Sequence, residues 1–289
     1  MTGQSTSSVG LAADLERRIL SGALTPGAKL PSERALADRH ALSRPMVREA
    51  LRRLAERGLV RVEAGRGSFV SSATGLDVGR SLNLAYQRRH VTARHIVEAR
   101  AMLESQAAAL AAERADERDL ALLSGTLERL EDLEATGDRV EQVRLDLAFH
   151  LGIARAAHNP VLEVMFGSIA PLAVEQMLRS VSDPRTRRKS HPYHRAAYEA
   201  IAARDPAAAA TALRDHLHVA DDTYGPDYDR SLDAMAHRAL EGLLGPDASL
   251  DAFVEELLPA SDLPLPDLPH PELPLDALAP RRVGSGQTG

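Results

Sequence analysis

The stretch GAKLPSERALADRHALSRPMVREALRRLAERGLVRVEAGRGSFV, residues 27–70, decides the fold of the N-terminal part of the chain. Ser32 is placed to cap a short helix that runs to Arg39. Ser43 is placed to cap a longer helix, which continues to Arg57 and ends at Gly58. The short β-rich runs 59–62 and 68–70 flank a glycine-containing turn and predict a hairpin.

The residues before this stretch predict one more helix. Apolar side chains recur at helical spacing from Val9 to Leu20, and Gly22 follows them as a stop signal. Three helices followed by a β-hairpin, with a tight turn between the second and third helices, describe a winged helix-turn-helix. We therefore expect such a domain over residues 1–72.

Arginines in this region stand where a nucleic acid could meet them. Arg44 and Arg48 lie four residues apart near the start of the third helix, so both side chains point to one side, suited to guanine edges and phosphates. Arg34, at the start of the second helix, can reach the DNA backbone. Arg66 stands between two glycines at the hairpin tip, which lets it enter a minor groove. Each arginine alone could instead be an ordinary solvated side chain.

The whole pattern resembles the GntR family of bacterial transcription regulators. The resemblance rests on Gly27-x-Lys29-Leu30-Pro31-Ser32-Glu33-Arg34, Ser43-Arg44-x-x-Val47-Arg48-Glu49-Ala50-Leu51, Gly58-Leu59-Val60 and Gly65-Arg66-Gly67-Ser68-Phe69-Val70. It implies DNA contacts from seven residues: Arg34, Ser43, Arg44, Arg48, Gly65, Arg66 and Gly67. Pro45 stands where family members often carry a hydroxyl residue, which removes a phosphate donor, so the base preference of this chain can differ.

Composition supports a soluble, cytoplasmic protein with a core. Of 289 residues, 44% are hydrophobic and 26% are charged, which excludes a wholly disordered chain. The absence of cysteine excludes disulfides, thiolate metal sites and cysteine nucleophiles. The polar N-terminus lacks a signal core, and no apolar run reaches the roughly 18 residues that span a bilayer.

Charge is distributed unevenly along the chain. Residues 1–72 carry 12 Lys and Arg against 7 Asp and Glu, whereas residues 73–242 carry 21 against 26. Residues 243–289 carry 2 against 8. A polyanion is therefore expected to meet the first block alone.

Residues 73–242 have helical periodicity throughout. The expected helices span 76–89, 93–114, 117–135, 139–157, 160–179, 189–204 and 206–223, with a less distinct one at 229–243. Short connections between them predict an all-α antiparallel helical bundle, so the fold class is mainly α. Residues 243–289 form an acidic tail with seven prolines between positions 259 and 280, expected to be disordered or extended. A partner-binding role for this tail is the alternative.

Polar residues interrupt the apolar faces of three of these helices. Asp146 and His150 stand one turn apart on helix 139–157, while His194 and His216 stand on the inward faces of helices 189–204 and 206–223. Because burial of an unpaired carboxylate is costly, a compensating partner is expected. One Asp and three His make a plausible first shell for zinc or nickel. Taken singly, each histidine could be a satisfied core residue.

Other residues of the bundle add to this hypothesis. Arg100 lies on the inward face of helix 93–114 and is suited to bidentate capture of a carboxylate, although it could instead pair with Glu104. His191 and His218 fall off the inward faces and are expected at the surface.

Residues 76–223 resemble the all-helical FCD ligand-binding domain of the FadR subfamily. The resemblance rests on Arg100-x-x-x-Glu104, Asp146-x-x-x-His150, Asn159-Pro160, His194 with Ala200-Ile201, and His216-Leu217. It implies a metal bound by Asp146, His150, His194 and His216, with a small carboxylate effector completing its coordination. The extra helix at 76–89 is typical of the FadR type rather than the shorter VanR type. The intact quartet favours a hydroxy or sugar acid over a fatty acyl-CoA.

The favoured hypothesis is a ligand-responsive transcription regulator that is not an enzyme. By the resemblance it would be a repressor and a homodimer on a palindromic operator. Two alternatives remain open: the metal is itself the signal or only a structural staple, or the protein is a metal-dependent hydrolase with a DNA-binding head.

Overall fold

The structure is a computed structural model. It describes residues 7–63, 65–71, 79, 82, 85–86, 88–133 and 138–231. The chain divides into two compact units between Ala73 and Thr74.

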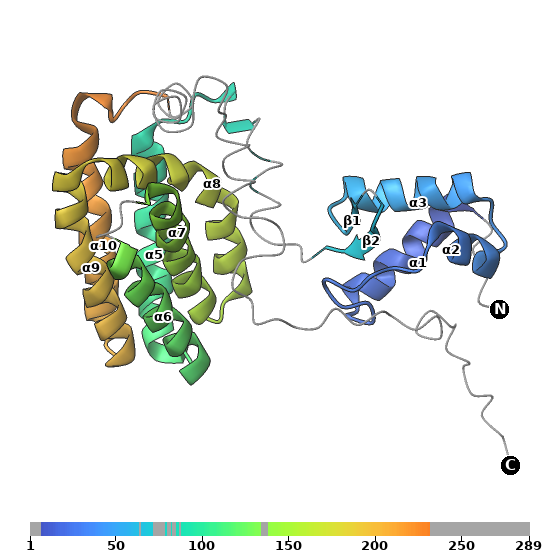
Figure 1. Ribbon diagram of the computed structural model, residues 1–289, viewed down its shortest axis with the longest axis horizontal. Helices are drawn as coiled ribbons and strands as arrows, with labels where there is room; N and C mark the ends of the chain where they lie inside the picture. The colour runs from blue at the N-terminus through green and yellow to red at the C-terminus, as the bar shows by residue number, and fades with distance from the viewer. Residues whose placement is uncertain are drawn as a thin grey trace, which may run out of the picture. The chain divides into compact units, whose positions relative to one another are not determined.

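The N-terminal unit consists of three helices and a hairpin (Figure 1). Its elements are α1 (Ser8–Leu20), α2 (Glu33–His40), α3 (Arg44–Glu56), β1 (Val60–Glu63) and β2 (Gly67–Val70). Helix α3 packs against α1, α2 and β1 and contributes the buried side chains of Val47, Leu51 and Leu54 to a common core. This arrangement confirms the expected winged helix-turn-helix.

Two glycines form the turn of the hairpin, and the loop that precedes α2 pairs with its second strand. Strands β1 and β2 are antiparallel, with Val60 opposite Val70. Gly65 and Gly67 have φ angles of 75° and 119°, values that favour glycine. On the free edge of β2, the Leu30 amide donates to the Ser68 carbonyl at 2.8 Å. The hairpin is therefore paired on both sides of β2.

The two serines predicted to cap helices behave differently. Ser32 Oγ accepts from the Ala35 amide at 3.2 Å and caps α2. Ser43 occupies the capping position of α3, but its side chain makes no capping hydrogen bond. Pro45 has no N–H and removes one of the two amides that such a side chain could accept from. The predicted Ser43 cap is therefore wrong, and the hydroxyl is exposed.

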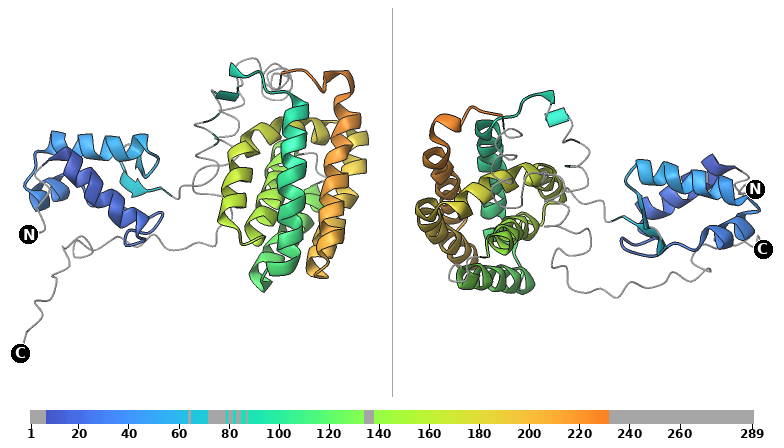
Figure 2. Two further views of the ribbon diagram at one scale, coloured as in Figure 1. Left: turned by 180° about the vertical axis from the view of Figure 1, so that it is seen from behind. Right: turned by 45° about the horizontal axis from the view of Figure 1, so that its top comes forward.

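The second unit is an all-helical bundle (Figures 1 and 2). Its elements are α5 (Ala93–Arg114), α6 (Glu117–Leu133), α7 (Arg139–Ala156), α8 (Pro160–Ser182), α9 (Pro184–Ala202), α10 (Pro206–Tyr224) and the 3-10 turn η1 (Gly225–Asp227). Helix α10 packs along α5 and α9. A bridge joins Thr92, just before α5, to Ser231, beyond η1, so α5 and α10 run antiparallel. The predicted bundle is confirmed.

Helix α9 begins earlier than predicted, at Pro184 rather than 189. The carboxylate of Asp183 accepts from the amides of Arg185 and Thr186, and proline is favoured in a first turn. Pro192 therefore lies inside the helix rather than near its start. Helix α8 also extends past 179, to Ser182.

Several predicted elements fall largely outside the described residues. Within 76–89, the described residues Gly79, Leu82, Ala85, Tyr86 and Arg88 are helical, Arg89 lies in a turn, and the others lie outside the described residues. The distinction between FadR and VanR types depends on that segment. Of the predicted helix 229–243, residues 229–231 are not helical and the remainder lies outside the described part. The tail 243–289 lies outside it as well.

Helix α8 has the length and apolar composition of a membrane-crossing helix, but it serves as a core helix. Within its most apolar 18-residue window, 61% of residues are buried in the protein. Ala170, Ala173 and Val174 pack against Val143 and Leu147 of α7. Its hydrophobicity is therefore explained by its place in the bundle.

Candidate functional site

The predicted DNA-reading arginines of α3 share one acidic partner. Arg48 donates to both carboxylate oxygens of Glu33, at 3.1 and 3.0 Å, and Arg44 Nη2 lies 3.9 Å from the same carboxylate. The hydrogen bond from Arg48 lowers the pKa of Glu33 despite its partial burial. The side chains of Arg44 and Arg48 remain 64% and 67% exposed. Glu33, which the sequence interpretation placed only in a first helical turn, holds the two arginines side by side.

The other predicted DNA contacts are also exposed. Arg34 is 85% exposed, with Nε 3.8 Å from Asp38. At the hairpin tip, Arg66 is 76% exposed and lies 2.7 Å from Glu63. Lys29 was not predicted to take part, but its Cε lies 3.3 Å from the position that a Cβ on Gly67 would occupy. The tip thus carries a second cation beside it.

In the helical bundle, the four predicted metal ligands come together. Asp146 and His150 stand on α7, His194 on α9 and His216 on α10, and one ligand atom from each lies within 4.8 Å of all the others. Asp146 Oδ1 is 2.9 Å from His194 Nε2 and 3.7 Å from His150 Nε2. The ring centres of His194 and His216 are 4.3 Å apart.

These atoms are buried without hydrogen-bond partners. They are Asp146 Oδ1, His150 Nε2, both ring nitrogens of His194, and His216 Nδ1. Buried polar atoms are normally satisfied, and leaving them unpaired is costly. A cation between them would satisfy one atom of each of the four residues at once. One carboxylate oxygen with three imidazole nitrogens is a donor set suited to zinc or nickel, so the residues fit a metal.

The ionisation states of these groups also suit a metal. Burial, and then the neighbouring His194 and His150, hold the pKa of His216 well below its usual value, so its imidazole is neutral. Burial opposes ionisation of Asp146, but attraction to His194 outweighs it and lowers the pKa of Asp146. A neutral imidazole and an ionised carboxylate are the forms that ligate metals.

Glu104 of α5 is a site residue that the sequence interpretation considered only as a partner of Arg100. It is 2% exposed, and its carboxylate contacts His150 Nδ1. Burial would raise the pKa of Glu104, but Arg100 and His150 outweigh it and lower the pKa to about 2. Glu104 thus faces Nδ1 of His150, while Nε2 of the same ring lies on the side of Asp146.

Arg100 is buried, and two of its three guanidinium nitrogens have hydrogen-bond partners. Its Nε donates to Glu104 Oε1 at 2.5 Å, and Nη1 donates to Gln176 Oε1 of α8 at 2.6 Å. Nη2 is buried and has no hydrogen-bond partner. The alternative pair with Glu104 therefore forms, and one guanidinium nitrogen, rather than two, is free for the expected bidentate capture.

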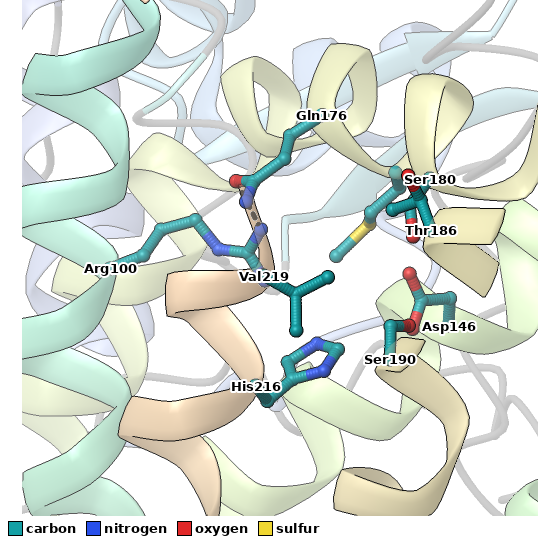
Figure 3. A pocket seen from close by; sticks show the side chains of 9 residues that line it. Arg100, Asp146, Gln176, Ser180, Thr186, Ser190, His216 and Val219 are labelled. Carbon is teal, nitrogen blue, oxygen red and sulfur yellow. Dashed lines mark hydrogen bonds between the residues drawn. The ribbon is translucent and has the colours of Figure 1, made fainter. Parts of the chain in front are cut away.

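Arg100 and two of the four predicted ligands line one pocket (Figure 3). Arg100 and Gln176 face Asp146 across it, and His216 closes another side. The polar side chains of Ser180, Thr186 and Ser190 also line it. The sequence interpretation missed these residues, as it missed Gln176. The feature that could have revealed them is a polar residue on an otherwise buried helix face.

His191 and His218, both predicted to lie at the surface, differ in where the structure places them. His218 is exposed, as predicted. His191 is half-buried, with its ring centre 5.8 Å from that of His194, so its predicted surface position is wrong. The early start of α9 leaves His191 well inside the helix, where its side chain reaches its neighbour one turn away.

Comparison with known proteins agrees with both units. The model for bacterial regulatory proteins of the gntR family matches residues 8–70, and the FCD domain model matches residues 95–219. The chain is 32% identical over 204 residues to the HTH-type transcriptional regulator LutR of Bacillus subtilis, covering 69% of this chain and 92% of that protein. It is 31% identical over 216 residues to the Glc operon transcriptional activator of Escherichia coli K12, covering 72% and 84%.

A solved structure gives the same result. The Streptococcus agalactiae GntR structure has 30% sequence identity and a TM-score of 0.56, covering 73% of this chain and 97% of that one. The relatives are transcription regulators and not enzymes, which leaves the hydrolase alternative without support. The chain belongs to the GntR family of bacterial transcription regulators and joins a DNA-binding winged helix-turn-helix to an FCD domain.

Proposed function

We propose that the protein is a metal-containing sensor of a small organic or sugar acid, which modulates its binding to a DNA operator. The observation that carries the proposal is the shared pocket: the free nitrogen of Arg100 and ligand residues of the Asp–His cluster line the same space. A carboxylate in that space can meet a cationic group on either side.

In this proposal Asp146, His150, His194 and His216 hold a zinc or nickel ion, which attracts one oxygen of the acid. Arg100 Nη2 donates to another oxygen of the same molecule. Ser190 offers a hydroxyl to the rest of it.

On the DNA side, we propose contacts from Arg34, Ser43, Arg44, Arg48 and the hairpin tip Gly65–Gly67. A cytoplasmic homodimer would place two such heads on the half-sites of a palindrome. Repression is the proposed direction, and a coupling of about 1–3 kcal/mol between acid and operator would be enough to switch occupancy. A promoter reporter decides the direction, since a relative described above is an activator.

The experiment is thermal unfolding of the full chain against a panel of small organic and sugar acids, with metal-loaded and chelator-treated protein in parallel. An acid at 100 times its Kd should stabilise the folded state by about 2.7 kcal/mol, a shift of a few degrees. A shift with one acid that disappears after chelation supports the proposal. No shift with any acid, with or without metal, contradicts it.

The unfolding assay, together with a measurement of operator affinity, separates the alternatives for the metal. Operator affinity that follows metal without any acid makes the metal the signal, while stabilisation by metal alone makes it structural. His150→Ala should lower metal content and the response to acid but leave operator binding intact. His218→Ala, which removes an exposed histidine of α10, is the control and should change neither.

A further inference from the structure

A single buried carboxylate joins the arginine side of the pocket to the metal side. Glu104 Oε1 accepts from Arg100 Nε at 2.5 Å, and Glu104 Oε2 contacts His150 Nδ1. The side chains of Glu104, Arg100 and His150 are each no more than 2% exposed. Water therefore cannot replace either contact of Glu104.

We propose that Glu104 is a positioning residue: it holds His150 in the tautomer whose Nε2 faces the ligand cluster while it holds Arg100 at the pocket. The proposal deepens the proposed function and rests on it for the presence of a metal. Metal binding and carboxylate binding then depend on one side chain that touches neither the ion nor the acid.

The tautomer follows from which atoms remain free. His150 Nε2 is buried without a hydrogen-bond partner and lies 3.7 Å from Asp146 Oδ1, on the side of the other ligands. With the proton on Nδ1, directed at Glu104, Nε2 presents a lone pair to a cation. With the proton on Nε2, the ring could not bind a cation through that atom.

Glu104→Gln tests this directly because an amide has nearly the same shape but only one accepting oxygen. If that oxygen faces Arg100, the amide N–H₂ faces His150 Nδ1 and favours the wrong tautomer. If it faces His150, the N–H₂ opposes Arg100 Nε–H, donor against donor. Either orientation breaks one of the two contacts, whereas Glu104→Asp keeps two accepting oxygens on a shorter stem.

Glu175→Gln is the matched control. Glu175 of α8 is also a fully buried glutamate, and it pairs with an arginine one turn away, Arg179, at 2.7 Å. Its other partner is the hydroxyl of Tyr224, not a histidine. The control carries the general cost of replacing a buried glutamate by glutamine without altering any ligand of the cluster.

The measurement is Zn²⁺ affinity of full-length protein by competition with a chromophoric chelator, without any acid present. Loss of a carboxylate that orients a ligating histidine typically weakens metal binding about 10–100-fold, and we expect that loss in Glu104→Gln. Glu104→Asp should recover part of it, and Glu175→Gln should bind like the unchanged protein. Equal affinity in Glu104→Gln and the unchanged protein overturns the inference.

A second measurement does not depend on any substitution of Glu104. Long-range ¹⁵N–¹H correlation spectra of histidine-labelled, metal-free protein report which nitrogen of His150 carries the proton, with His150→Ala supplying the assignment. A proton on Nδ1 is expected, and a proton on Nε2 overturns the inference. Failure of the unchanged protein to bind Zn²⁺ or Ni²⁺ would instead contradict the metal in the proposed function, and the tautomer would still be read.

Discussion

One glutamate in each unit pairs with an arginine. Because one pair is exposed and the other is buried, substitution of the two glutamates is expected to have different effects. Glu33 binds Arg48 at the surface, where an ion pair adds little to stability, so its effect is on the direction of the guanidinium. Glu104 binds Arg100 in the interior, where removal of one partner leaves a buried charge without compensation. Substitution at the first is expected to change recognition, and substitution at the second to change the pocket.

Removal of either recognition arginine should abolish specific operator binding and leave the fold intact. Arg44→Ala and Arg48→Ala each delete an exposed side chain that packs in no core cluster of the N-terminal unit. Electrophoretic mobility shift and circular dichroism measure the two effects. Arg129→Ala, which removes an exposed arginine from the helical bundle, controls for net charge. Unchanged operator affinity in both variants would contradict the assigned DNA contacts.

Glu33→Gln should separate specific from non-specific binding. The loss of a negative charge beside two arginines should strengthen binding to random duplex, which depends on phosphate contacts. The loss of the bidentate anchor should weaken binding to the operator by about tenfold, because base contacts require a directed guanidinium. Fluorescence anisotropy with both duplexes at one salt concentration gives the ratio. A parallel rise in both affinities would show that Glu33 does not orient Arg48.

At the scale of helices, the site depends on where each one starts. The side chain of Asn159 caps α8 and that of Asp183 caps α9, each accepting from two backbone amides. From these starts, α8 brings Gln176 to Arg100, and α9 brings His194 to Asp146. Each cap therefore fixes the residue at which its helix begins.

Loss of the α8 cap should cost stability in proportion to its hydrogen bonds. Asn159→Ala removes the acceptor for the amides of Val161 and Leu162, and a lost cap costs about 1 kcal/mol. For a unit of this size the melting temperature should fall by about 2–4 °C in differential scanning calorimetry. Asn159→Asp retains a side-chain oxygen and should melt close to the unchanged protein. Equal losses in the two variants would mean that the cap does not act through its hydrogen bonds.

At the scale of the whole molecule, the basic N-terminal block and the acidic remainder restrict DNA to one part of the chain. The winged unit is small and carries one recognition helix, which reads a short site. The proposed homodimer would supply two copies of this helix through symmetry.

A palindromic operator should bind two chains together and more tightly than one half-site does. Linking two heads through a dimer makes the second contact intramolecular, which raises affinity by about 10²–10⁴-fold over one contact. Sedimentation of the protein with a full palindrome and with a half-site duplex gives both stoichiometry and affinity. Binding of one chain per palindrome, at half-site affinity, would contradict the dimer.

The sequence was sufficient for the fold class and for the proximity of the four predicted ligands, because both depend on local periodicity. The inward faces of α7, α9 and α10 could be read from spacing alone, and the helices carry Asp146, His150, His194 and His216 to one place. The start of α9 was placed at 189 although Asp183 and Pro184 already form a start signal.

Contacts between helices could not be read in the same way. Glu104 and Gln176 are polar residues on buried faces, but nothing in their spacing says that one meets His150 and the other Arg100. The pair of Glu33 with Arg48 joins two helices across a turn and was equally invisible. Residues on one helix could be related from the sequence, whereas residues on different helices required the packed structure.

Because Arg100 donates to Gln176, this side chain would compete with a bound acid for the guanidinium group. An acid that grips the guanidinium with two oxygens must displace the Gln176 amide, which is always present at a high local concentration. Half-response is then reached only when the acid outcompetes that amide. If the proposed sensor holds its acid in this two-oxygen way, a side chain at position 176 that cannot accept a hydrogen bond should move the dose–response curve to lower concentrations.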